Sequence, residues 1–160
     1  MQFAVALSKQ TDTDAAALEV AAAIRTRLGG TPIDLACVFF SAHHTEGVGR
    51  LAELLSETLR SKLLLGCSGE GVIAGAEELE TTPALTVWAA VLPDVHLHPL
   101  HSSFSPTQDQ FHLTGWPIPG VDDGSFLLLA DPFTTPVQDI LGILDDRYPG
   151  AQAIGGLVGG

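Results

Sequence analysis

Residues 62–75 join a short apolar run to a segment that contains four glycines. The run 63–65 is typical of a buried strand, and the glycines beside it can adopt positive φ or admit a second backbone or a small ligand. These glycines are Gly66, Gly69, Gly71 and Gly75. Two interpretations remain open, a bulged turn between core strands and a loop that contacts a ligand. Any function that this sequence reveals is expected at this loop.

Apolar runs alternate with amphipathic helical segments ahead of the loop. Residues 3–7 and 35–40 are apolar enough to be buried strands, and Thr11 can cap a helix between them. A second helix is predicted to begin at Thr45 or Glu46. The predicted buried faces are Ala17, Val20, Ala21, Ile24 and Leu28 in the first helix, and Val48, Leu51, Leu55 and Leu59 in the second. This alternation predicts a parallel sheet with right-handed crossovers.

The pattern changes in the second half of the chain. Residues 84–92 and 95–100 are strand-like runs around a Pro-Asp turn signal, which predicts an antiparallel hairpin. Residues 102–124 are rich in Ser, Thr, Pro, Gly and Asp, so they are predicted to form a long surface excursion. Its expected anchors are the aromatic residues Phe104, Phe111 and Trp116.

The last part of the chain has the pattern of a strand, a helix and a strand. Residues 125–130 form a fully apolar run, which ends at Asp131 because the proline that follows disfavours helical backbone there. A third helix is predicted with Thr135 as its N-cap, and residues 151–158 form a strand interrupted by glycines. The predicted buried face of this helix is Val137, Ile140, Leu141, Leu144 and Tyr148.

The length of 160 residues fits a single domain with a sizeable core. The sequence therefore predicts one α/β domain over residues 1–160. Its sheet is expected to be mixed, with a parallel βαβαβ first half, an antiparallel hairpin and a final strand–helix–strand unit.

The charge of the chain excludes some classes of partner. With 7 basic and 19 acidic residues the formal net charge is −12, which repels phosphate backbones and anionic lipid, so we expect no nucleic-acid and no membrane partner. The two cysteines, Cys37 and Cys67, lie in apolar runs and are interpreted as free thiols in a reducing compartment. No basic segment precedes the first apolar run, and no run approaches bilayer length, so a cytoplasmic location is expected.

Several motifs have the composition of a binding site. Residues 69–74 match G-x-G-x-x-A, but the acidic segment after them has no amphipathic helix to hold a pyrophosphate, so we do not expect nucleotide binding. His96 and His98 would share one face of a strand, and a half-solvated strand is favoured over a metal or haem ligand pair. His43 and His44 follow a predicted strand at its carboxyl end, where one of them can face a pocket.

Cys67 and Asp131 each have two interpretations. Cys67 lies beside Ser68 and Glu70, but a nucleophile needs an assigned base, and an acidic neighbour raises the pKa of a thiol. A buried or pocket-lining thiol is therefore favoured, and we expect no enzymatic activity. Asp131 can hold a ligand amine or cap the turn ahead of the third helix, and both remain open.

Four motifs taken in order resemble the N-terminal domain of the FIST family. They are Leu-Gly-Cys-Ser-Gly-Glu-Gly-Val-Ile-Ala-Gly at 65–75, Pro-Ala-Leu at 83–85, Leu-Ala-Asp-Pro-Phe at 129–133 and Ile-Gly-Gly-Leu at 154–157. Any one of them alone is weak, and their order and spacing over residues 34–160 carry the resemblance.

The resemblance implies an intracellular sensory domain of bacterial signal transduction that binds a small, amino-acid-like ligand and passes the signal to a protein partner. It also implies two alternatives: a haem-dependent nitric-oxide sensor that uses one of the four histidines above, and a substrate-recruitment module, as in eukaryotic F-box proteins. The cofactor is left unspecified. The candidate ligand-binding residues are Gly66, Cys67, Ser68, Gly69, Glu70, Asp131, Gly155 and Gly156.

Family members usually continue into a C-terminal FIST domain, so we expect this chain to be truncated. The last strand, residues 151–158, is then expected to expose an unpaired edge through which two copies can associate.

Overall fold

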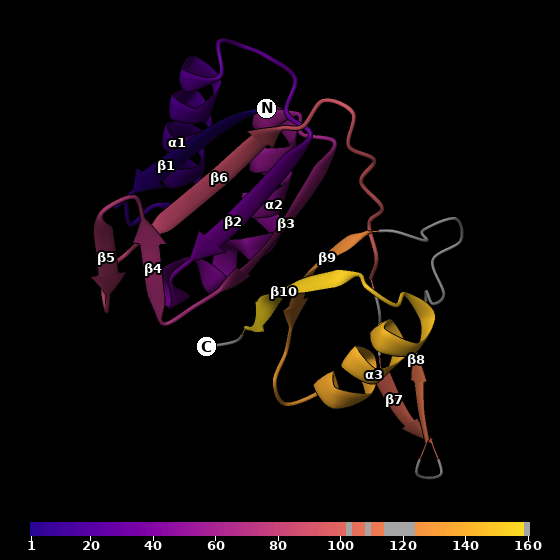
Figure 1. The fold of residues 1–160 in the computed structure, drawn as a ribbon. Helices are drawn as coiled ribbons and strands as arrows, with labels where there is room; N and C mark the ends of the chain where they lie inside the picture. The colour runs from indigo at the N-terminus through magenta and orange to yellow at the C-terminus, as the bar shows by residue number, and fades with distance from the viewer. Residues whose placement is uncertain (102–103, 108–109, 114–123, 159–160) are drawn as a thin grey trace. The chain divides into compact units, whose positions relative to one another are not determined.

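The computed structural model describes residues 1–101, 104–107, 110–113 and 124–158 (Figure 1). The chain divides into two compact units, Met1–Leu97 and His98–Gly159, and each is described by itself. In the first unit the elements are β1 (Gln2–Ser8), α1 (Thr13–Arg27), β2 (Leu35–Phe40), the 3-10 helix η1 (Ala42–Gly47), α2 (Val48–Leu59), β3 (Leu63–Ser68), β4 (Gly71–Ala74), β5 (Glu77–Glu80) and β6 (Leu85–Val91). In the second unit they are β7 (Phe104–Thr107), β8 (Gln110–Leu113), β9 (Ser125–Ala130), α3 (Val137–Arg147) and β10 (Gln152–Leu157).

The main sheet of the first unit has the strand order β1-β6-β2-β3. β2 and β3 are parallel, whereas β6 is antiparallel to both β1 and β2. β1, β2 and β3 therefore run in the same direction, as the βαβαβ pattern predicts, and β6 is inserted between β1 and β2. The mixed α/β fold class is confirmed.

The prediction that residues 84–92 and 95–100 form an antiparallel hairpin was wrong. Residues 95–100 form no strand, and β6 pairs with β1 and β2 instead. β6 is buried on both faces, with Val87 and Ala89 fully buried on one side and Thr86 and Ala90 on the other. A strand of that kind belongs in the middle of a sheet, where both of its edges are paired.

An antiparallel hairpin exists in the first unit, formed by β4 and β5 (Figure 1). Its turn is Gly75 and Ala76, and Gly75 has a φ of 63°, as the first position of a type II′ turn requires. Residues 69–74 therefore lead into a hairpin and not into a helix, in agreement with the sequence pattern.

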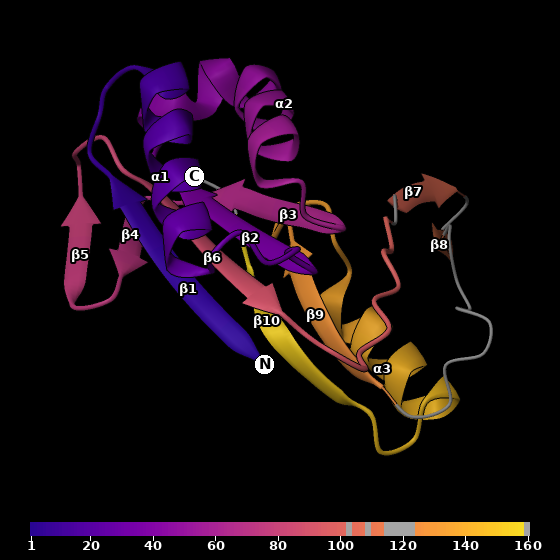
Figure 2. The same ribbon diagram turned by 90° about the horizontal axis from the view of Figure 1, so that it is seen from above.

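Helices α1 and α2 cover the same face of this sheet (Figure 2). The core lies between them and alternate strand residues, including Ala6, Val38 and Val87. The whole predicted face of α1 is buried. In α2, Leu51, Leu55 and Leu59 are buried as predicted, but Val48 is 46% exposed because residues 42–47 form a 3-10 helix and α2 begins only at Val48.

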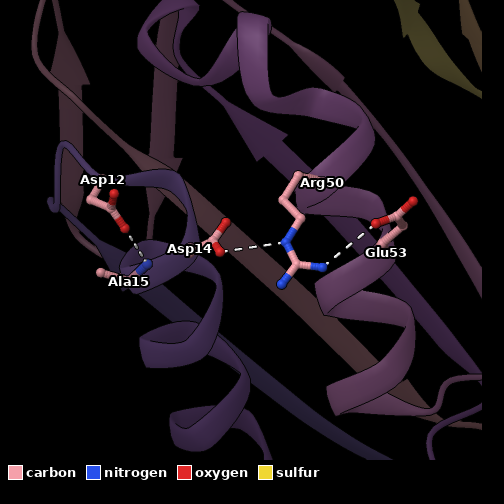
Figure 3. Close-up of polar contacts among 5 residues, drawn as sticks. All are labelled: Asp12, Asp14, Ala15, Arg50 and Glu53. Atoms are coloured by element: carbon pink, nitrogen blue, oxygen red, sulfur yellow. Dashed lines mark hydrogen bonds and ion pairs between the residues drawn. The ribbon is translucent and has the colours of Figure 1, made fainter.

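Polar side chains fix the start of α1 against α2 (Figure 3). The N-cap is Asp12 and not Thr11, since the Asp12 carboxylate accepts a hydrogen bond from the Ala15 amide at 2.8 Å. Arg50 of α2 lies between two carboxylates, 3.4 Å from Asp14 and 3.6 Å from Glu53. Only the Asp14 pair joins the two helices, since Glu53 is on α2 with Arg50, and both pairs are at least half exposed, so they add little stability.

The second unit contains the predicted final strand–helix–strand. β9 and β10 are parallel, and α3 packs Ile140, Leu144 and Tyr148 around Phe126. The rings of Phe126 and Tyr148 lie 5.2 Å apart between centroids. The N-cap of α3 is Pro136, one residue after the predicted Thr135, and no side chain caps it.

Two further expectations for the second unit need correction. Leu141 is 38% exposed, so it is not part of the buried face of α3. The segment predicted as a long surface excursion contains a hairpin of β7 and β8. Phe104 and Phe111 lie in these strands, while the predicted anchor Trp116 is outside the described residues. Across the described part of the chain, no helix has the length and apolarity needed to cross a membrane.

Candidate functional site

The carboxyl ends of β2 and β3 lie at one edge of the sheet. The strands pair in register, so Phe40 is opposite Ser68, and the Gly69 amide donates to the Phe40 carbonyl at 2.9 Å. The polar segments 41–43 and 68–70 therefore start side by side. We call this region the carboxyl edge. Open α/β sheets commonly bind ligands at such an edge.

The glycine-rich stretch is not the open loop that the sequence predicts. Gly66 lies inside β3 and Gly71 begins β4, which leaves Gly69 and Glu70 as the bend between the two strands. A β-carbon at Gly66 would overlap the carbonyl oxygen of Val38 and come within 2.9 Å of the Val38 β-carbon. Gly66 therefore permits a close approach of two backbones, and Cys67 and Ser68 are strand residues.

Ser41 and the two histidines after it occupy different environments. Ser41 is 4% exposed, accepts a hydrogen bond from the Ala84 amide at 3.0 Å and lies 3.2 Å from His43 Nδ1. His44 is completely buried, with its Nδ1 3.0 Å from the Thr13 hydroxyl. Of this pair, His43 is the exposed one and remains available at the carboxyl edge.

The burial of His44 affects its protonation. Its Nε2 has no hydrogen-bond partner among the residues that the structure describes. Burial lowers the pKa of His44, the neighbouring His43 lowers it further, and Asp12 acts in the opposite direction. His44 is therefore a neutral structural side chain at neutral pH and is not a ligand-facing one.

The two thiols are free and share the sheet face opposite α1 and α2. Cys37 is opposite Leu65 and Cys67 is opposite Phe39, so both occupy alternate positions on that face. Burial raises the pKa of Cys37 to about 11, with a further contribution from Cys67. Burial also raises the pKa of Cys67. Because a thiolate is the reactive form, this agrees with a half-buried thiol and not with an activated nucleophile.

Three predicted site residues lie in the second unit. The Asp131 carboxylate accepts hydrogen bonds from the Phe133 amide at 2.9 Å and the Thr134 hydroxyl at 2.8 Å, and these bonds lower its pKa. Its turn-capping role is therefore confirmed. Gly155 and Gly156 are in β10, opposite Leu128 and Leu129 of β9. The other five predicted residues belong to the first unit, so a site shared by all eight stays a prediction.

The ligand pair considered for His96 and His98 depends on a shared strand face. His96 and His98 lie in a segment without strand structure, so the shared face predicted for them was wrong. His43 and His44 are hydrogen-bonded to Ser41 and Thr13. Each bond uses only the Nδ1 of its ring, so a haem ligand among these histidines stays a prediction. In the described part of the chain, no group of three or more His, Cys, Asp or Glu side chains is placed to hold a metal ion.

The first unit contains a cavity of about 630 Å³ that the sequence pattern does not predict. Its lining comes from the end of β1, from α1 and from the β4–β5 hairpin: Val5, Leu7, Lys9, Gln10, Glu19, Arg27, Ala74, Gly75 and Glu77. We call it the β1 groove. No local pattern marks it, because the residues are separated by most of the first unit in sequence and meet only after the sheet forms.

The chain belongs to the FIST N domain family, whose pattern matches residues 34–160, and this confirms the resemblance found in the motifs. Two mycobacterial proteins are similar to it over its whole length. The uncharacterized protein Rv0628c of Mycobacterium tuberculosis is 34% identical over 161 residues, and the uncharacterized protein Mb0898c of Mycobacterium bovis is 30% identical over 163 residues. The chain spans 41% of the length of each relative. No solved structure matches it significantly.

Proposed function

We propose that this chain is the ligand-binding part of a sensory domain in signal transduction, and that the carboxyl edge of β2 and β3 forms the binding surface. The FIST family is associated with signal-transduction sensing. The relatives named above are uncharacterized, so the choice of ligand rests on the family resemblance and on the groups present at the site.

The in-register pairing of β2 with β3 is the observation that carries this proposal. It brings the segment 41–43 beside the segment 68–70, and these contain two hydroxyls, an imidazole and a carboxylate within a few residues of the strand ends. Glu70 and His43 are both exposed. A carboxylate can accept hydrogen bonds from an ammonium group, and an imidazole can donate one to a carboxylate.

An amino-acid-like ligand fits this set of groups, since it carries an ammonium and a carboxylate on adjacent atoms. Asp131, Gly155 and Gly156 remain candidates in the second unit. The Asp131 carboxylate already receives two hydrogen bonds from its own turn, so it has less capacity left for a ligand amine.

Thermal unfolding with the proteinogenic amino acids and their decarboxylated or deaminated analogues tests the proposal. A compound that binds only the folded chain at about 100 times its Kd stabilises it by about 2.7 kcal/mol, or roughly 5–10 °C in Tm at this size. The rise should saturate with concentration. It should be lost in Glu70→Gln and weakened in His43→Gln.

Glu57→Gln is the matched control, because Glu57 is an exposed glutamate on α2, away from the carboxyl edge. It should respond like the unmodified chain. An unchanged Tm with every compound, measured on a chain that unfolds cooperatively, would overturn the proposal. A compound that stabilises all variants equally would place its binding site elsewhere.

A further inference from the structure

The β1 groove surrounds the free edge of a strand. Among the described strands, β1 pairs with β6 alone, so the backbone amides and carbonyls on its other edge have no strand partner there. On one side of this edge lies α1, which supplies Glu19 and Arg27, and on the other the β4–β5 hairpin supplies Ala74, Gly75 and Glu77. A free edge of this kind can pair with an added strand.

The floor of the groove is apolar. Val5 and Leu7 are two residues apart on β1, so their side chains point to the same face, and both are half-buried. An extended peptide that pairs with β1 would place its own alternate side chains beside them. Small or branched apolar side chains at every second position fit this floor.

The groove has a negative charge at one end and a positive charge at the other, both supplied by α1. The Glu19 carboxylate accepts a hydrogen bond from the Ser8 hydroxyl at 2.5 Å, which places it near the end of β1. Arg27 is the last residue of α1 and has no hydrogen bond or ion pair with any residue that the structure describes. Eight residues of helix separate the two side chains, or about 12 Å along the axis.

That separation corresponds to about four residues of extended chain at roughly 3.3 Å per residue. Because α1 returns from the end of β1 towards its beginning, Glu19 lies nearer the end of β1 and Arg27 nearer its start. A carboxylate attracts a free amino terminus, and a guanidinium binds a free carboxylate in a bidentate manner. A peptide held in this way runs antiparallel to β1.

We propose that the β1 groove binds a short peptide of about four residues with free ends, which adds as an antiparallel strand to β1, with its ammonium at Glu19 and its carboxylate at Arg27. Lys9 and Glu77, which form an ion pair with each other, close the groove beyond Leu7. No residue of the carboxyl edge takes part, so this site is independent of the proposed sensory ligand.

The probe is the tetrapeptide Val-Ala-Val-Ala with free ends, titrated into the ¹⁵N-labelled 160-residue chain and followed by amide chemical shifts. We expect saturable shifts in the amides of β1 and of the β4–β5 hairpin, and none at residues 66–70. Acetylating and amidating the peptide should weaken binding about tenfold or more. N-methylation of alternate amides, on the edge that faces β1, should abolish it, because strand addition depends on backbone hydrogen bonds.

Arg27→Ala and Glu19→Gln should each weaken binding at least about fivefold. The control is Arg25→Ala, which removes an arginine from the same helix whose guanidinium donates to the Thr58 carbonyl at 3.2 Å, outside the groove. Its affinity should be unchanged. The proposal is overturned if the β1 amides do not shift, if the N-methylated peptide binds as well as the unmodified one, or if Arg27→Ala and Arg25→Ala have the same effect. Spectra of the free variants establish that each is folded.

Discussion

Gly66 faces Val38 across the parallel pair of β3 and β2, and there is no room for a β-carbon between the two backbones. Gly155 and Leu128 have the same relationship in the second unit, across the pair of β10 and β9. In both cases the glycine is the fourth residue of a strand that follows a helix, and it lies opposite the fourth residue of the preceding strand. In both strand–helix–strand units, a glycine therefore allows the two parallel strands to approach closely.

The first prediction concerns Gly66. Gly66→Ala should lower the free energy of unfolding by about 2 kcal/mol or more, because the added methyl forces β3 away from β2. Gly49→Ala is the matched control, since Gly49 lies in α2 with no atom within 4 Å of a β-carbon built there. That substitution should raise the free energy of unfolding by about 0.5 kcal/mol through helix propensity. Urea unfolding measures both, and equal effects would contradict the close approach.

The second prediction concerns Gly155. Its φ of 153° and the overlap of a β-carbon with the Leu128 carbonyl both disfavour a side chain, so Gly155→Ala should destabilise β10. Hydrogen exchange of the amides in β9, α3 and β10 should become faster. Gly142→Ala, in α3 and without a neighbour within 4 Å of the new methyl, should slow exchange or leave it unchanged. If exchange became faster to the same extent in both variants, the effect would not come from the contact between Gly155 and Leu128, and the prediction would be wrong.

The third prediction is a pH dependence that comes from His44. Its pKa is lowered in the folded chain, so below an unfolded value of about 6.5 the unfolded chain binds a proton that the folded chain does not. Stability should therefore fall as the pH drops from about 7.5 to about 5.5, and the loss should level off below the folded pKa. His44→Gln should reduce this slope in urea unfolding, whereas His98→Gln, at an exposed position, should keep it. An unchanged slope in His44→Gln would assign the effect to other groups.

The fourth prediction concerns Asp34, which joins three strand ends. Its carboxylate accepts from Lys62 Nζ at 2.7 Å and from the Leu92 amide at 2.6 Å, and the Lys62 bond is the larger cause of its lowered pKa. Its contribution to stability is present above the unfolded pKa of 3.8 and is lost as the pH falls through the lower folded pKa.

The urea midpoint at pH 7 should therefore decrease in the order unmodified chain, Asp34→Asn, Asp34→Ala. The side-chain amide oxygen of the asparagine variant can still accept the hydrogen bond from the Leu92 amide, but it carries no charge to attract Lys62. The alanine variant loses both interactions. Asp139→Asn, at an exposed position in the first turn of α3, serves as the control and should leave the midpoint nearly unchanged. Equal midpoints for the two Asp34 variants would show that the hydrogen bond from the Leu92 amide does not contribute to stability.

The amino-acid pattern alone determined most of the local structure of this protein. In α1 the buried residues recur three and four positions apart, as in any amphipathic helix, so Val20 and Ile24 were correctly predicted to lie in the core. The apolar run of β2 is likewise contiguous in sequence and mostly buried, whereas β9 was predicted correctly as a strand but leaves Leu127 45% exposed. The glycine motifs also identified the family, because their order and spacing can be read without knowing how the chain folds.

Only the tertiary structure decided which strands become neighbours. The insertion of β6 between β1 and β2 depends on two free edges that exist only after the βαβαβ segment has formed, so the local turn signal at Pro93 pointed to the wrong partner. The burial of His44 against Thr13 and the meeting of Glu19 and Glu77 in one groove have the same origin. Contacts between residues far apart in sequence produce no periodic pattern in either segment. The sequence pattern therefore predicts the helices and strands, whereas the sites depend on how these elements pack together.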